Sequence, residues 1–362
     1  MTRPARALID VAALRHNLGR VRALAPGTRV LAIIKANGYG HGMVRVAHAL
    51  QTADGFGVAC LEEALILREA GIHQRIVLLG GMFDVADLTL VDQHRLDLVV
   101  HHESQAALLE QARVRCPISI WLKIDTGMHR LGIHPSRLPW LWQRLAGCSN
   151  VRQPMRLMTH LASADEPHNP QTPEQLACFF ACTEGFASER SLANSAAILA
   201  WPAAHGNWVR PGIMLYGISP FCDTIGADLD LRPAMTLGTQ LVAVKRVERG
   251  GAIGYGGTWV CPETMPIGVA AIGYGDGYPR QIPSGTPVLL NGKPVPVVGR
   301  VSMDLITLDL RTQPDAELGD AVVLWGRGLP IEQLAARVGT IAYELVCGIA
   351  PRVRFIEEER ID

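Results

Sequence analysis

Two patterns of hydrophobic and polar positions alternate through the first two-thirds of the chain. Short apolar runs rich in β-branched residues predict buried strands, and apolar residues spaced three and four apart predict helices. The first predicted strand covers residues 30–34 and leads directly into Lys35. Further strands are predicted at Gly55–Cys60, Arg75–Leu79, Leu96–Val100, Ile118–Asp125, Met155–His160, Ser191–Asn194 and Trp208–Arg210. Helices are predicted from Asp10 to about Ala25 and at Met43–Leu50, Leu61–Ala70, Gln105–Val114, Leu138–Leu145 and Pro173–Phe186.

Eight strands that alternate with helices over about 200 residues are typical of a (β/α)₈ TIM-type barrel. A doubly wound parallel sheet is the alternative, but the glycines that follow Lys35 lack the spacing of a dinucleotide-binding turn. We therefore assign residues 1–230 to a barrel. After about Leu231 the pattern changes to short alternating runs, with a hairpin turn signal at Asn291-Gly292 and one helix at Ile331–Val338. Residues 231–362 are predicted to form a second, mostly-β domain.

The amino-acid composition indicates which kinds of binding partner the protein has. The 362 residues carry 34 basic and 34 acidic side chains, so no net field favours binding to nucleic acid or to an anionic membrane. Eight scattered cysteines form no CxxC pair, so no metal site is predicted. Neither a signal peptide nor an apolar run of membrane-spanning length is evident. We expect a cytoplasmic protein whose partner is a small molecule.

Lys35 is the first candidate for chemistry. It stands at the carboxyl end of a buried strand and is followed by Ala36-Asn37-Gly38-Tyr39-Gly40-His41-Gly42. A lysine that loses its hydration there has a depressed pKa, which suits it to form a Schiff base. The alternative fits this stretch equally well: Lys35 has no catalytic role, and its long side chain extends from the strand end into water.

Charged side chains also follow the middle strands. The period of two places Lys123 and Asp125 on one face, and Arg130 lies just beyond that strand. A buried ion pair between Lys123 and Asp125 is one interpretation of this spacing. His160 ends the next strand, where a lone histidine is more often a core residue than a catalyst.

The last two strands of the predicted barrel lead into segments suited to phosphate. Ser195 offers a hydroxyl group, and Gly212 and Ile213 offer consecutive backbone amides. Phosphate in barrels of this class is commonly bound by the loops after the seventh and eighth strands. A serine or a glycine turn alone is common in any protein. The prediction of a phosphate site therefore rests on finding both after the last two strands.

Two of these segments resemble motifs of the alanine racemase family. They are Lys35-Ala36-Asn37-Gly38-Tyr39-Gly40-His41-Gly42 and Lys123-Ile124-Asp125-Thr126-Gly127-Met128-His129-Arg130-Leu131-Gly132. The family commonly has alanine in place of Gly38 and phenylalanine in place of Leu161. The resemblance extends over nearly the whole chain, with about eight motifs in the family's order. It implies a barrel that binds pyridoxal 5'-phosphate (PLP), followed by a β domain.

The resemblance also implies a role for each candidate residue of the barrel. Lys35 binds PLP and is one of two catalytic bases, and Arg130 contacts the cofactor's phenolic oxygen and the substrate carboxylate. His160 stacks on the pyridine ring, and Arg210 faces the pyridine nitrogen. Lys123 corresponds to a lysine that is carbamylated in many members of the family. The cofactor phosphate is bound by Tyr39, Ser195, Gly212, Ile213 and Tyr343.

Racemisation needs a second base, because a planar carbanion is reprotonated from either face. By resemblance this base is Tyr255 of the other subunit of a homodimer, with Met303 and Asp304 of that subunit lining the substrate pocket. A free tyrosine has a pKa of about 10, so the phenolate needs cationic neighbours, for which His160 and Arg210 are the candidates. The implied entryway residues are Asp165, Tyr274, Arg280, Arg300 and Ile341.

The predicted function is PLP-dependent, two-base interconversion of L-alanine and D-alanine. It would supply D-alanine for peptidoglycan or serve alanine catabolism. The nearest alternative is a racemase of broader range that acts on serine or basic amino acids. A barrel PLP decarboxylase is disfavoured, because such enzymes usually place a carboxylate, not an arginine, at the pyridine nitrogen. A non-catalytic PLP carrier is disfavoured because such proteins are usually a barrel alone.

Overall fold

The computed structural model describes residues 3–359 and separates into two compact units. The first, the barrel unit, is Arg15–Leu215; the second, the β unit, combines the residues up to Leu14 with those from Tyr216 onward. This division differs from the expected one, because the amino-terminal segment belongs with the carboxyl-terminal part and the change of unit comes before residue 230.

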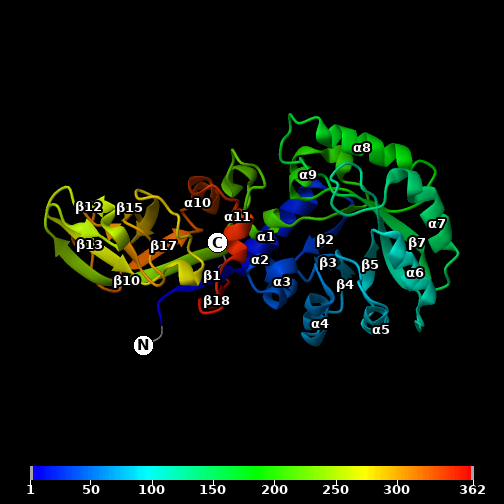
Figure 1. Ribbon diagram of the computed structural model, residues 1–362, viewed down its shortest axis with the longest axis horizontal. Coiled ribbons are helices and arrows are strands. Elements are labelled where there is room, and N and C mark those ends of the chain that lie inside the picture. Colours follow the sequence, from blue (N-terminus) through cyan, green and yellow to red (C-terminus); the bar gives the residue numbers. More distant parts are fainter. Residues whose placement is uncertain (1–2, 360–362) are drawn as a thin grey trace. The chain divides into compact units, whose positions relative to one another are not determined.

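The barrel unit contains eight parallel strands with helices outside them (Figure 1). The strands are β2 (Arg29–Ile33), β3 (Gly55–Val58), β4 (Arg75–Leu78), β5 (Asp97–Val100), β6 (Ile118–Lys123), β7 (Val151–Met158), β8 (Arg190–Ser191) and β9 (Trp208–Val209). The helices are α1 (Val11–Leu24), in which the division between units falls, α2 (Lys35–Tyr39), α3 (Met43–Ala49), α4 (Leu61–Glu69), α5 (Val85–Gln93), α6 (Glu103–Gln111), α7 (Leu138–Ala146), α8 (Gln171–Cys182) and α9 (Ser195–Ala200). The sheet order β8-β7-β6-β5-β4-β3-β2-β9 is that of a (β/α)₈ barrel.

Backbone hydrogen bonds close this sheet between its first and last members. Asn207 N donates to Arg190 O at 2.9 Å, and Arg210 N donates to Ala193 O at 2.9 Å. Inside the barrel, Trp121 and Trp208 pack edge to face with ring centroids 5.3 Å apart. Because β3 and β5 are buried along their whole length, their apolar runs predict them well.

The β unit is a mostly antiparallel sheet with two short helices. Its strands are β1 (Arg6–Asp10), β10 (Met235–Val247), β11 (Ala252–Ile253), β12 (Trp259–Val260), β13 (Met265–Ala270), β14 (Pro287–Leu290), β15 (Lys293–Val298), β16 (Ile306–Asp309), β17 (Ala321–Trp325) and β18 (Arg354–Glu358). Its helices are α10 (Ile331–Val338) and α11 (Ala342–Cys347). Strand β10 pairs with β17 along one half and with β13 along the other, which closes six strands into a small barrel.

Two local features of the β unit can be compared with the sequence prediction. The Asn291-Gly292 turn joins β14 to β15, and both turn residues have positive φ, so the predicted hairpin is confirmed. Strand β1 was not predicted, although Ala7 and Ile9 are fully buried. It pairs with β10 and β18, more than 220 residues along the chain, so no local signal marks it.

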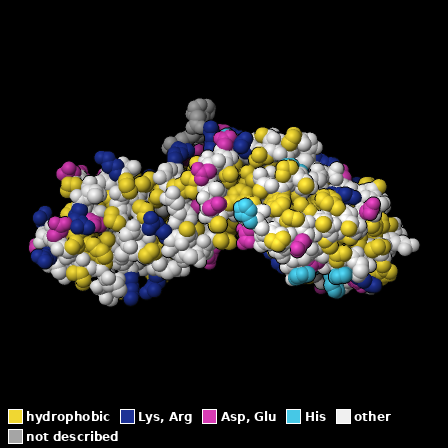
Figure 2. All heavy atoms as spheres, turned by 90° about the horizontal axis from the view of Figure 1, so that it is seen from above, with side chains coloured by type: hydrophobic (Ala, Val, Ile, Leu, Met, Phe, Trp, Pro, Cys, Tyr) yellow, Lys and Arg dark blue, Asp and Glu magenta, His cyan; other side chains and the backbone are white. Residues whose placement is uncertain are grey.

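Three properties of the structure can be set beside the composition: the charge on the surface, the state of the cysteines and the length of the helices. On the face drawn in Figure 2, charged side chains of both signs are scattered among hydrophobic ones, without a continuous basic area. Each of the eight cysteines is a free thiol. Within residues 3–359, no helix has both the length and the apolar character needed to cross a bilayer.

Candidate active site

Five of the predicted site residues lie at or shortly after the carboxyl ends of parallel strands of the barrel unit. Lys35 lies two residues after β2, Lys123 ends β6, and His160 lies two residues after β7. Ser195 begins α9 after β8, and Arg210 follows β9. Because the strands of this fold open their carboxyl ends on one face, these side chains gather at one end of the barrel.

Lys35 begins a left-handed turn that the sequence did not predict. The φ angles of Ala36, Asn37, Gly38 and Tyr39 are 52°, 54°, 64° and 49°. Such a run is unusual for residues other than glycine and persists only where the surroundings fix it. At Gly38 a Cβ atom would lie 3.1 Å from Cγ2 of Val46, so this turn also packs closely on α3.

Side chains near Lys35 supply the bonds that fix this turn. Glu63 Oε1 accepts from Ala36 N at 2.7 Å, and its Oε2 accepts from Ala59 N at 2.8 Å. Asn37 Oδ1 accepts from Met43 N at 2.9 Å. Glu63 caps an amide of the turn, and Asn37 ties the turn to the first residue of α3, so the backbone that carries Lys35 is held in one conformation.

Arg210 is a buried cation held mainly by carbonyl groups. Its Nη2 donates to Thr159 O at 2.6 Å, and its Nη1 donates to Ser191 O and Oγ at 2.8 Å. Burial lowers the pKa of Arg210 to about 10, so the guanidinium stays charged at neutral pH. It pairs with no carboxylate among the described residues, so its charge remains available to a ligand.

His160 is neutral, and Arg210 sets its tautomer. Arg210 Nη2 lies 3.3 Å from His160 Nδ1. Because a guanidinium only donates, Nδ1 accepts and the ring proton lies on Nε2. Burial, followed by the charge of Arg210, holds the pKa of His160 well below its usual range. The depressed pKa favours a neutral His160 that donates through Nε2, which differs from the expectation that His160 is a cationic neighbour of the phenolate.

Lys123 is also buried and has a depressed pKa. Burial, with the charges of Arg210, Arg130 and Lys35, lowers the pKa of Lys123 to about 8. The interpretation of Lys123 as an ion-pair partner of Asp125 is not borne out among the described residues. Asp125 Oδ1 instead accepts the backbone amides two and four residues later, at 3.1 and 3.0 Å. Arg130 lies in this loop with its side chain exposed.

The predicted phosphate site brings together segments from three strand ends. Gly212 N donates to Ser195 Oγ at 2.8 Å, which leaves the serine hydroxyl proton free to donate to a ligand. A Cβ atom at Gly212 would lie 2.6 Å from Oη of Tyr39. Tyr39, Ser195 and Gly212 therefore meet in a space that only glycine permits, with Ile213 beside it.

Sequence reasoning missed Gln175 of α8, which connects the loops after β6 and β7. Its Nε2 donates to Thr126 Oγ1 at 3.3 Å and to His160 O at 3.1 Å, and its Oε1 accepts from Ala162 N at 2.8 Å. The side chain is almost completely buried. A glutamine on the apolar face of a predicted helix was the signal that could have identified it.

The other candidates lie on the β unit, except Asp165, which is exposed in the barrel unit. Tyr255 follows β11 and is 69% exposed, and Met303 is 52% exposed. Asp304, Tyr274, Arg280, Arg300 and Ile341 are also exposed or nearly so, and Tyr343 of α11 is half-buried. Within the β unit, Tyr274 N donates to Ser302 O at 3.0 Å, which joins its loop to the segment that carries Met303.

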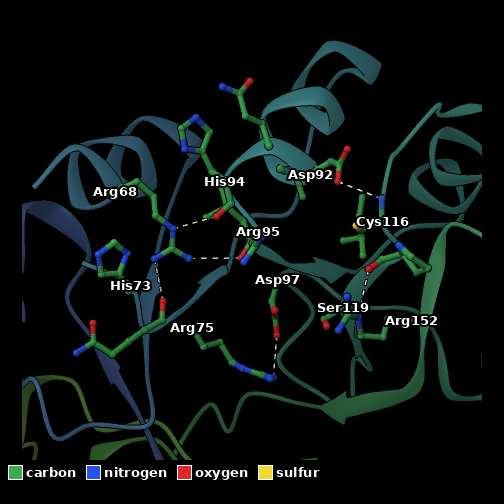
Figure 3. Close-up of a pocket in the computed structure, with 16 residues that line it drawn as sticks. Arg68, His73, Arg75, Asp92, His94, Arg95, Asp97, Cys116, Ser119 and Arg152 are labelled. Atoms are coloured by element: carbon green, nitrogen blue, oxygen red, sulfur yellow. Dashed lines mark hydrogen bonds and ion pairs between the residues drawn. The ribbon is translucent and has the colours of Figure 1, made fainter. Parts of the chain in front are cut away.

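A cavity of about 680 Å³ lies at the opposite, amino-terminal end of strands β4, β5 and β6 (Figure 3). It contains none of the predicted site residues. Arg68 donates there to His94 O at 2.9 Å and to Gln74 O at 2.8 Å, while Arg75 pairs with Asp97 at 3.0 Å. Its polar side chains bind backbone carbonyl groups and one another. Such bonding is typical of the amino-terminal end of a barrel, which contributes to stability.

Comparison with known proteins identifies relatives over the whole chain. Residues 9–220 match the model of the alanine racemase N-terminal domain, and residues 234–357 match that of its C-terminal domain. The alanine racemase of Nitrosococcus oceani is 55% identical over 350 residues, covering 96% of this chain and 97% of that protein. That of Coxiella burnetii is 50% identical over 361 residues, covering 98% and 99%. The crystal structure of the biosynthetic alanine racemase from Pseudomonas aeruginosa has a TM-score of 0.95 at 44% identity, covering 99% and 100%.

Proposed function

Because this chain belongs to the alanine racemase family, a family of isomerases, we propose that it interconverts L-alanine and D-alanine with PLP bound in the barrel unit. The observation that carries the proposal is the group of Lys35, His160 and Arg210 at the carboxyl ends of β2, β7 and β9. We further propose that the enzyme acts in the cytoplasm, in peptidoglycan synthesis or alanine catabolism.

The residues at this end of the barrel fit PLP. Tyr39 and Ser195 lie beside Gly212, and their hydroxyl groups would contact the cofactor phosphate together with the Gly212–Ile213 backbone. Tyr343 of the β unit is proposed to contact the phosphate as well. Lys35 would hold the cofactor's aldehyde carbon, with His160 against the ring and Arg130 at the phenolic oxygen. When bound, PLP supplies an electron-accepting ring that stabilises negative charge on the substrate's α-carbon.

Arg210 limits how far that charge spreads. The guanidinium stays protonated and would face the pyridine nitrogen. Because Arg210 has no proton to give up at neutral pH, it would leave that nitrogen unprotonated, which would limit the electron-accepting chemistry that the cofactor supplies. Charge that stays near the α-carbon favours return of the proton over other reactions, which supports a racemase.

The two proton transfers are assigned to opposite faces of the substrate. Lys35 would remove or return the α-proton on one face, and Tyr255 of the partner subunit would do so on the other. The Nε2–H of neutral His160 would donate to the tyrosine oxygen, with Arg210 behind it. A histidine hydrogen bond backed by a buried arginine stabilises the phenolate that this role needs.

We propose a homodimer in which the β unit completes the partner's site. The candidate residues of the β unit include large exposed apolar side chains, at Tyr255, Met303 and Ile341. In the dimer that the family resemblance implies, these side chains would be buried against the other chain. In that arrangement Met303 and Asp304 would contact the substrate, and Asp165, Tyr274, Arg280, Arg300 and Ile341 would line the entryway.

Lys123 is proposed to be carbamylated. At a pKa of about 8, roughly a tenth of the amine is neutral at pH 7, and that fraction can attack carbon dioxide. The new N–C bond forms with loss of one proton from nitrogen, so a buried cation becomes an anion. The anion would lie near Arg130 and Arg210, whose charges lower the pKa of Lys123.

We expect Lys123→Met to change the pH dependence of stability in buffers depleted of carbon dioxide. The folded pKa of about 8 lies below the ordinary 10.5, so folding penalises the charged amine below pH 8 and the penalty disappears as pH rises to 10.5. The variant therefore gains about 1–3 kcal/mol at pH 7 and nothing above pH 10.5. Urea unfolding at pH 7 and pH 10 measures this, and an equal difference from wild type at both pH values would contradict it.

An activity assay with purified protein tests the proposed function. We expect bound PLP to be visible by absorbance and L-alanine to lose optical rotation rapidly. L-Serine, L-lysine and L-arginine are run in parallel, and rapid loss of their rotation would replace the alanine assignment with a broader racemase. A PLP absorbance band without racemisation of any of them would overturn the proposal.

A further inference from the structure

The two ends of the described chain meet in a charged cluster on the β unit, which we call the arginine clamp: Arg3, Asp276, Asp304 and Arg352. Arg3 Nη2 lies 2.6 Å from Asp276 Oδ2, and Arg352 Nε lies 2.8 Å from Asp276 Oδ1. Each arginine also reaches Asp304 Oδ1, at 3.2 Å from Arg3 Nη1 and 2.9 Å from Arg352 Nη2. Two arginines 349 positions apart in sequence therefore converge on Asp276.

Asp276 anchors the two arginines. Its side chain is completely buried, and its Oδ2 also accepts from Gly273 N at 2.9 Å. A buried carboxylate is stable only with compensating charge, so Asp276 holds both guanidinium groups in place. Gly275 makes room for this, because a Cβ atom there would lie 2.5 Å from Arg352 Nη2.

The same arginines fix the backbone on either side of Asp304. Arg352 Nη2 donates to Met303 O at 3.2 Å, and Arg3 Nη2 donates to Asp304 O at 3.1 Å. Gly275 N also donates to Met303 O, at 2.9 Å. Carbonyl and carboxylate groups of the 303–304 segment are thus bound from two sides, while the Asp304 side chain remains 47% exposed.

The charges of the arginine clamp balance. Two guanidinium groups face two carboxylates, so Asp304 is neutralised where its side chain opens to solvent. An amino-acid substrate carries a carboxylate of its own, and an unpaired aspartate beside it would repel it. A paired Asp304 can lie next to an anionic substrate without that repulsion.

We propose that Arg3 and Arg352 are positioning residues that hold Met303 and Asp304 in place for contact with the anionic substrate. The inference rests on the proposed function, because it takes Met303 and Asp304 as substrate-pocket residues. Arg3 and Arg352 then affect the affinity for alanine and take no part in proton transfer, which is assigned to Lys35 and Tyr255. Loss of one arginine both loosens the 303–304 segment and leaves the clamp with a net negative charge.

Steady-state kinetics of Arg3→Met test the inference. KM for L-alanine and for D-alanine is expected to rise about tenfold, with kcat within threefold of wild type and PLP absorbance unchanged. The increase in KM is expected to shrink in high salt, because added ions screen the uncompensated carboxylate. Arg3→Lys keeps the charge but cannot bridge two carboxylates, so its KM should fall between those of wild type and Arg3→Met.

Arg327→Met is the matched control. Arg327 pairs with Asp10 of β1 at 2.7 Å in the same unit and is outside the arginine clamp. It should lose a similar amount of thermal stability while KM stays at the wild-type value. An unchanged KM in Arg3→Met, or an equal increase in KM in Arg327→Met, would overturn the inference. A wild-type protein that does not racemise alanine would instead count against the proposed function.

Discussion

Lys35→Ala is expected to lower kcat for alanine racemisation by about 10⁴-fold or more in both directions. The proposal gives this side chain two roles, since it holds the cofactor and is one of the two bases. The left-handed turn around it is fixed by Glu63 and Asn37, so the backbone should survive the loss of the side chain. Optical rotation with each enantiomer measures the effect, and circular dichroism checks the fold.

The lysine content of the chain supplies the control for this experiment. Only four lysines occur: Lys35, Lys123, Lys245 and Lys293. Lys245 is exposed on β10, so Lys245→Ala removes an amine without touching the candidate site. We expect that variant to keep wild-type activity and PLP absorbance. Activity above about one per cent in Lys35→Ala would contradict the assignment of Lys35.

The barrel could be predicted because its strands carry their own signal. Strands β3 and β5 are buried throughout, so their apolar runs stand out from the helices around them. The turn at Asn291-Gly292 is equally local, because its residue types alone favour positive φ. Strand β1 has no such signal: its place depends on pairing with β10, far along the chain.

The residues of the candidate site likewise fall into those that have a local sequence signal and those that have none. Lys35, Lys123 and Arg210 were candidates because each lies at or near the carboxyl end of a predicted strand, where this fold places its chemistry, and the family resemblance then implied their roles. The charge state of His160 could not be predicted, since it depends on burial and on an arginine from a different strand end. Tyr255 is exposed on the β unit and gives no signal of its own, so only the family resemblance identifies it.

Tyr255→Phe is expected to slow racemisation of both enantiomers by about 10²–10⁴-fold while PLP stays bound. The change removes only the phenolic oxygen, and the cofactor contacts proposed for the barrel unit remain. Tyr278→Phe is a matched control, because that hydroxyl is buried and has no hydrogen-bond partner among the described residues. It should leave racemisation unchanged. Normal turnover by Tyr255→Phe would end the two-base assignment.

Deuterium exchange in the same variant separates the two bases. With Tyr255 disabled, Lys35 still covers one face of the substrate, so one enantiomer continues to exchange its α-proton in D₂O without inversion. The other enantiomer, whose proton points toward the missing phenol, exchanges slowly. Mass spectrometry of L-alanine and D-alanine after incubation measures both rates. Equal exchange of the two enantiomers would mean that a single group serves both faces, because a one-base site has no reason to distinguish them.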